Sequence, residues 1–161
     1  MTRCARRRRG PAAALAALLV GTALSACSGS SDSASVSVFS VEPGQCFQAP
    51  STVQAELSSL TRVPCSKPHT REAYANVGYA APDGSSGGAY PGSDALTAFA
   101  NGACAQRYAG YVGVDYLDSS LFFTFLFPSA RSWQSDDDRK IICFVTTTGA
   151  KLTASVKGSK K

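Results

Sequence analysis

The chain has 161 residues, of which 44% are hydrophobic, with a formal net charge of +5 and a single histidine. Five of its sixteen Lys and Arg residues precede Cys27, whereas all eleven Asp and Glu residues follow it, so the chain from Cys27 onward has no formal net charge. The high isoelectric point is therefore no argument for a nucleic-acid-binding protein, which needs a basic patch in its folded part.

The first 26 residues have the pattern of a secretory signal peptide. Arg3 and Arg6–Arg9 form a basic region, and the apolar run AAALAALLVGTAL after them is short for a membrane span. The segment ends in Leu24-Ser25-Ala26-Cys27, which resembles a bacterial lipobox. Cleavage before Cys27 would let its sulfur carry a diacylglyceryl group, and two acyl chains anchor a protein where one does not. The alternative is ordinary cleavage after Ala26, which leaves a free thiol.

These patterns predict a lipoprotein at the extracytoplasmic face of the cell membrane. Its lipid is expected on Cys27, with palmitate among the acyl chains. A lipidated Ser-rich tether is expected over residues 27–40, one folded domain over 41–157 and a frayed basic tail over 158–161. The domain is long enough to build a core of its own.

The first part of the domain predicts short strands. Extended segments are expected over residues 36–41, 45–48 and 62–65, and alternating apolar residues indicate a further strand over 72–79.

The second part predicts one main helix and more strands. The helix is expected to have Ser93 as its N-cap and to end before Gly110, with an apolar face that includes Cys104. The segment SLFFTFLFP is apolar on both faces, which is typical of a central buried strand, here stopped by Pro128. The segments KIICFVTTT and LTASVK are expected to pair as a hairpin. The predicted fold is α+β, a small antiparallel sheet with one main helix packed on it and two disulfides.

The cysteines of the domain predict two disulfides, because an exported domain folds in an oxidising compartment. Four cysteines allow three pairings. Cys104 lies on the apolar helix face and Cys143 alternates with apolar strand residues, which favours Cys104–Cys143 and leaves Cys46–Cys65. No CxxC pair is present, so a metal site is not expected.

Any Ser–His or Cys–His mechanism would have to use His69, the only histidine, as its base. No nucleophile elbow, zinc-protease motif or phosphate loop occurs, and Asp136–Asp138 lacks the spacing of a calcium loop. We therefore expect no enzyme activity and no cofactor. For His69 three roles are open: a hydrogen bond to nearby backbone or to Glu72, contact with a partner, or catalysis.

The motifs, taken in order, resemble those of the septum formation family of actinobacterial envelope domains. The matching segments are VEPGQCF, RVPCSKPHTREAY, AYPG, the helix with ANGACAQRYAGYVG, FPSARSW, DDDR and IICFV. The matching positions are Gly44, Cys46, Phe47, Val63, Cys65, Pro68, His69, Glu72, Tyr90, Pro91, Gly92, Cys104, Pro128, Trp133, Asp138, Arg139 and Cys143. One difference is that Asp137 precedes Asp138-Arg139, where the family has Gly-Asp-Arg.

The resemblance implies a role in the cell envelope, near the division septum, and supplies no catalytic residue. We expect an anchored, non-enzymatic interaction domain whose partner is an envelope or divisome protein, with His69 and Trp133 as candidate contact residues. The alternatives are an envelope hydrolase that acts on peptidoglycan or glycan, and a carrier of a small ligand or lipid.

Overall fold

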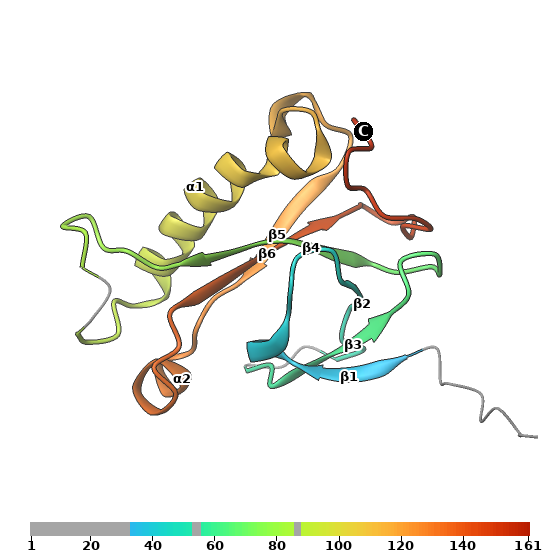
Figure 1. Cartoon of the computed structure of the whole chain (residues 1–161). Coiled ribbons are helices and arrows are strands. Elements are labelled where there is room, and N and C mark those ends of the chain that lie inside the picture. The colour runs from blue at the N-terminus through green and yellow to red at the C-terminus, as the bar shows by residue number, and fades with distance from the viewer. Residues whose placement is uncertain (1–32, 53–55, 86–87) are drawn as a thin grey trace, which may run out of the picture. The chain divides into compact units, whose positions relative to one another are not determined.

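The computed structural model describes residues 33–52, 56–85 and 88–161, which lie in one compact unit, Ser31–Lys161 (Figure 1). The predicted signal peptide, Cys27 and the rest of the predicted tether up to residue 32 fall outside the described residues. Within the described ranges, no helix has both the length and the apolar character needed to cross a membrane.

The fold is a six-stranded sheet in which every pair of neighbouring strands is antiparallel, in the order β1-β3-β2-β4-β6-β5. The strands are β1 (Ala34–Ser37), β2 (Cys46–Gln48), β3 (Ser59–Val63), β4 (Arg71–Gly78), β5 (Phe122–Leu126) and β6 (Lys140–Thr146). The helices are α1 (Ser93–Val112) and α2 (Ala130–Ser135), with short 3-10 turns η1 (Val38–Ser40) and η2 (Tyr116–Asp118). This confirms the predicted α+β fold.

The N-terminal strands differ in their bounds from the prediction. The expected strand over 36–41 is β1, which begins at Ala34 and gives way to η1, so the predicted tether already contains part of the sheet. The expected strand over 62–65 is β3, which ends at Val63 because Pro64 has no N–H to continue the pairing.

The sheet has an apolar cluster on each face, and β6 contributes to both. Ile141, Cys143 and Val145 face α1, whereas Ile142 and Phe144 pack on the opposite side with residues of β2 and β3. In Figure 1, α1 lies on one side of β4 and β6, and β1 and β3, at the far end of the same sheet, lie on the opposite side of these strands. The alternation predicted for Cys143 is therefore confirmed.

The prediction of a central buried strand for SLFFTFLFP is wrong. This segment forms β5, which pairs only with β6 and lies at one edge of the sheet, and the strand that is buried on both faces is β6. An apolar run alone does not distinguish the two positions, because an edge strand can also be covered in part on both faces.

The helix α1 is longer than predicted at its C-terminal end. Gly92 is the N-cap, and the helix runs from Ser93 past Gly110 to Val112. Gly113 caps its end with a φ of +89°, the left-handed conformation common at helix ends. Glycine inside a helix costs about 1 kcal/mol relative to alanine. Burial of Tyr111 and Val112 after Gly110 offsets this cost and keeps the last turn helical.

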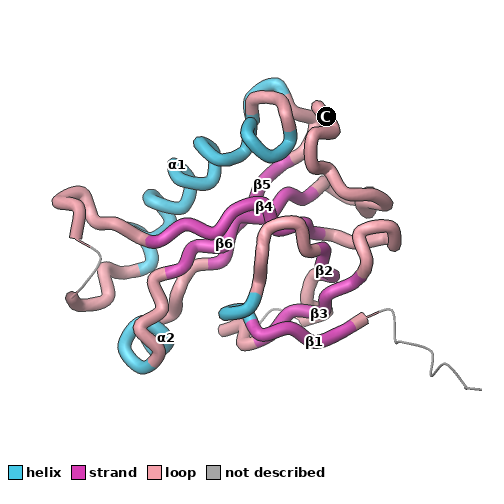
Figure 2. Tube along the Cα trace, viewed as in Figure 1, coloured by secondary structure: helices cyan, strands magenta, loops and turns pink. Residues whose placement is uncertain are grey.

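The expected hairpin between KIICFVTTT and LTASVK is not formed. Leu152 instead pairs with His69 in an isolated antiparallel bridge, in which each backbone N–H donates to the other residue's carbonyl at 2.8 and 2.9 Å. Figure 2 draws the segment after Leu152 as loop that ends beside the C-terminal end of α1.

Candidate functional site

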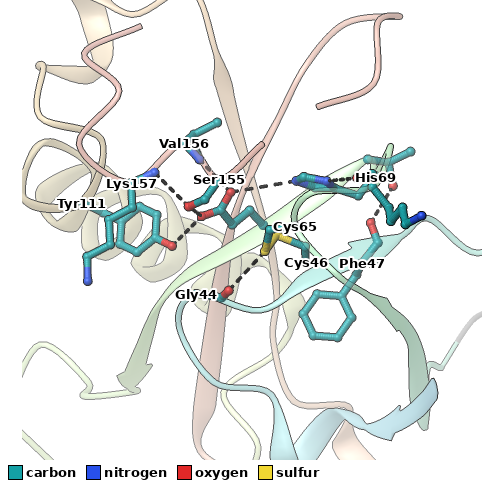
Figure 3. The surroundings of a disulfide bond; sticks show 12 residues. Gly44, Cys46, Phe47, Cys65, His69, Tyr111, Ser155, Val156 and Lys157 are labelled. Carbon is teal, nitrogen blue, oxygen red and sulfur yellow. Dashed lines mark hydrogen bonds and ion pairs between the residues drawn. A yellow bond between two sulfur atoms is a disulfide. The ribbon is translucent and has the colours of Figure 1, made fainter. Parts of the chain in front are cut away.

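Glu72 is the centre of a buried polar cluster beside the Cys46–Cys65 disulfide. Its side chain has no exposed surface and accepts three hydrogen bonds, from the Tyr111 hydroxyl at 2.6 Å, the Ser155 hydroxyl at 2.6 Å and the Val156 N–H at 2.9 Å. Figure 3 shows Tyr111 and Ser155 converging on this point from α1 and from the C-terminal segment. The carboxylate thus joins three parts of the chain that are far apart in sequence.

His69 lies in the same cluster and is fully buried. Its Nδ1 is 2.8 Å from the Lys67 carbonyl oxygen, which can only accept, so Nδ1 carries the proton. Its Nε2 is 3.9 Å from Glu72 Oε2 and has no hydrogen-bond partner. The expected bond to nearby backbone is present, whereas Glu72 lies beyond hydrogen-bond distance of Nε2.

The disulfide removes the thiol chemistry that the spacing of Cys65 and His69 suggests. Cys46 and Cys65 are bonded to each other, with Cα atoms 5.2 Å apart. Ligand atoms of Cys46, Cys65 and Glu72 lie within 4.8 Å of one another, but bonded sulfurs offer no thiolate to a metal. The Cys65 sulfur is 3.4 Å from the Gly44 carbonyl oxygen, a packing contact because that sulfur carries no proton.

Tyr111 remains a hydrogen-bond donor to Glu72 over the physiological range of pH. Burial is the main cause that raises the pKa of its phenol above the ordinary value, and the hydrogen bond to Glu72 adds to it. A neutral hydroxyl, a neutral serine and a backbone amide therefore surround one carboxylate. We interpret the role of this cluster as stabilising the fold, since Glu72 and His69 expose no surface to a substrate.

The last four residues, expected to be a frayed tail, are held by the end of α1. The Gly158 N–H donates to the Tyr111 carbonyl at 2.8 Å, and the Lys160 N–H donates to the Val112 carbonyl at 2.9 Å. These bonds satisfy helix carbonyls that have no partner inside the helix. The expectation was wrong because backbone capping by a distant segment leaves no signal in a Lys-rich sequence.

Trp133, a candidate contact residue, lies in the core with only 2% of its surface exposed. Its Nε1–H donates to the Gly88 carbonyl at 2.9 Å, and its ring packs edge-on against Tyr79 and Tyr90. The Arg139 guanidinium lies 3.7 Å from the ring centroid. Trp133 therefore offers no surface to a partner in this structure and instead joins α2 to the β4 end of the core.

In the turn before β6, this chain has Asp137 where the resemblance led us to expect glycine. Asp137 has a φ of +51°, in the left-handed region that favours glycine. Its carboxylate pairs with Arg139 at 3.0 Å, but 92% of the Asp137 side chain is exposed, so this pair contributes little to stability. The turn keeps its geometry at the cost of some backbone strain.

Replacing Asp137 with glycine is expected to raise the free energy of unfolding by about 0.5–1 kcal/mol, because the strain is relieved. The matched control is Asp136→Gly, since Asp136 has a φ of −117° and gains nothing from glycine. Urea denaturation of both variants measures the difference. A destabilised Asp137→Gly protein would contradict the strained conformation.

A surface groove of about 820 Å³ lies between the N-terminal strands and the β5–α2 region. Its apolar lining includes Val38, Phe39 and Leu57 from one side and Leu126, Phe127 and Ile142 from the other. Its charged lining consists of Glu56, Asp136, Asp138, Arg131 and Lys140. Phe39 is 47% exposed at this groove, which makes it one of three large apolar side chains with substantial exposure among the described residues.

Sequence reasoning missed Tyr111, Ser155 and the groove. Ser155 and Tyr111 approach Glu72 across sequence separations of 83 and 39 residues, and no local motif reports such contacts. The groove joins residues of η1, of the segment 56–58 before β3, and of β5, which lie far apart in the sequence. Only the exposed Phe39, isolated among serines and valines in SVSVFSV, gives a local signal.

Comparison with known proteins leaves one finding. No curated protein and no solved structure matches the chain. A family model described as septum formation matches residues 43–160, which span the whole sheet from β2 onward, both disulfides and the segment that caps α1. The chain therefore belongs to the septum formation family.

Proposed function

We propose that this protein is a lipid-anchored, non-enzymatic interaction domain on the extracytoplasmic face of the membrane, where it presents its surface groove to a protein of the envelope or division septum. Family membership points to an envelope or septum role. The observation that carries the molecular part of the proposal is the groove, with an apolar floor, a charged rim and the exposed Phe39. Exposed aromatic surface beside polar residues is typical of protein-binding sites.

The absence of reactive side chains at the buried cluster supports a binding role over catalysis. The four cysteines of the domain are paired in disulfides, and the single histidine is fully buried. A Ser–His or Cys–His mechanism needs an imidazole that reaches the substrate. The proposal therefore assigns no catalytic step to His69.

A carrier of a small apolar ligand is the second candidate, and the same groove favours it. A volume of about 820 Å³ lies within the range of small-molecule sites. Ligand sites usually bury most of a small ligand, however, whereas this groove is open and has Phe39 half exposed. An extended protein surface suits such a groove better.

The lipid anchor is tested by Cys27→Ser. Without a thiol no thioether forms, so we expect metabolic labelling with palmitate to be lost and the protein to leave washed membranes. The circular dichroism and melting temperature of the domain should be unchanged, because Cys27 precedes the sheet. A Cys27→Ser protein that stays in the membrane fraction would rule out this anchor.

The groove is tested by proximity labelling in living cells with Phe39→Ser. We expect this variant to lose the main labelled partner, because an apolar anchor of the groove is removed. Leu117→Ser is the matched control, since Leu117 is 87% exposed and is not part of the groove lining. A partner retained by Phe39→Ser, or lost equally with Leu117→Ser, would contradict the assignment of the groove.

A further inference from the structure

The outer edge of β5 is open to pairing with another strand. β5 pairs with β6 along its whole length, from Phe122 opposite Thr146 to Leu126 opposite Ile142. Across the described residues, no other strand pairs with it. Its outward N–H and C=O groups therefore form a row that another extended chain can bind.

Within its five residues, this edge has neither a charged residue nor a proline, two features that usually prevent strand addition. No charged residue occurs from Leu121 to Pro128, and Phe122 is 44% exposed. Natural sheets protect long edges with lysine, proline, bulges or short strands. The opposite edge, β1, is four residues long and contains only Ala, Ser and Val, so β5 is the more adhesive edge of the two.

The same strand, β5, also lines part of the groove. Phe125, Leu126 and Phe127 line it, so a chain that pairs with β5 passes directly beside its apolar floor. Strand addition of this kind takes affinity from backbone hydrogen bonds and specificity from pockets for alternate side chains. The strand β5 thus supplies both the open edge and part of the groove lining.

The charges at the groove favour a basic partner segment. Glu56, Asp136 and Asp138 face two cations, and one of these, Lys140, donates its Nζ hydrogen to the Phe39 carbonyl at 2.6 Å. Asp136 and Glu56 are exposed. With Arg131 as the second cation, the lining has an excess of one negative charge, which favours Lys or Arg in a partner.

We propose that β5 and the groove bind an extended segment of an envelope protein, which pairs with β5 as a seventh strand. Its alternate apolar side chains enter the groove, and a flanking Lys or Arg faces Glu56 and Asp136. The inference rests on the proposed function, because it names the chemistry of the partner that the groove receives.

The experiment measures binding of synthetic peptides to the purified full chain in mild detergent. The probe is a nine-residue peptide of alternating valine and threonine with lysine at both ends. A second peptide has glutamate at both ends, and a third is the lysine peptide with alternate backbone nitrogens methylated. We expect the lysine peptide to bind about fivefold more tightly than the glutamate peptide and the methylated peptide to lose binding.

Variants of the protein test whether the peptide binds at the proposed surface. The double variant Glu56→Gln/Asp136→Asn should remove the preference for lysine ends, and Asp118→Asn, at an exposed acid outside the groove, should retain it. Equal binding of the methylated peptide, or no charge preference, would overturn the proposal. A dimer in sedimentation velocity that Phe122→Lys dissociates would also overturn it, because a second copy would then occupy β5.

The two proposals fail separately. Loss of the labelled partner with Phe39→Ser, together with no binding of any peptide, would refute strand addition and keep the interaction domain. Peptide binding as expected, with no envelope partner labelled through Phe39, would refute the cellular role and keep the binding chemistry.

Discussion

Replacing Glu72 with alanine is expected to lower the free energy of unfolding by about 3–5 kcal/mol, because each buried donor left without its acceptor costs about 1–3 kcal/mol and the lost side chain leaves a cavity. The variant leaves the Tyr111 hydroxyl and the Val156 N–H in the interior without their acceptor and opens a cavity beside the disulfide. Guanidinium denaturation measures the loss. Hydrogen exchange of Leu152 and Val156 should also accelerate, because the segment that carries them loses its anchor.

Glu42→Ala is the matched control for this prediction. Glu42 is an exposed glutamate shortly before β2, and its replacement should change stability by no more than about 0.5 kcal/mol. Glu72→Gln keeps the shape and one acceptor oxygen, so its loss should fall between the two. An equal, small loss of unfolding free energy for Glu72→Ala and Glu42→Ala would show that the cluster does not stabilise the fold.

Removing the Cys104–Cys143 disulfide with a double alanine variant is expected to cost about 4 kcal/mol, and removing Cys46–Cys65 about 3 kcal/mol. The two bridges close segments with sequence separations of 39 and 19 residues, and the longer loop gains more freedom in the unfolded chain when it is released. Both sulfurs of the Cys104–Cys143 bridge also lie in the core between α1 and β6.

Denaturation midpoints of the two double variants test this order. The unmodified protein under oxidising conditions is the reference, and peptide mapping without reductant verifies that the remaining bridge is intact. A Cys46→Ala/Cys65→Ala protein that unfolds before the Cys104→Ala/Cys143→Ala protein would contradict the loop-length argument. It would indicate that contacts of the Glu72 cluster depend on the shorter bridge.

The sequence predicted those parts of the fold that depend on local periodicity. The 3.6-residue pattern located α1, and the two-residue pattern located β6, so the facing positions of Cys104 and Cys143 and their bond followed correctly. The family pattern then added the order of the motifs. Such signals are reliable because each depends only on residues within one element.

Long-range pairing was beyond local reasoning. Leu152 has the strand-like neighbours expected of a hairpin, yet it pairs with His69, more than eighty residues earlier. The aromatic run of β5 suggested a central position although it lies at an edge. In both cases the sequence indicated an extended conformation correctly, and the partner was decided by the packing of the whole domain.

The bridge to Leu152 and the bonds from Ser155 and Val156 to Glu72 have a consequence for how the chain acquires its shape. These contacts join residues 69–72 to residues 152–156, so they require most of the domain to be present. In the proposed lipoprotein, which would leave the cytoplasm N-terminus first, Glu72 would cross the membrane well before its hydrogen-bond donors. The interior then holds an uncompensated carboxylate, which opposes premature closure. The proposed lipoprotein would therefore become rigid only after its final segment has crossed the membrane.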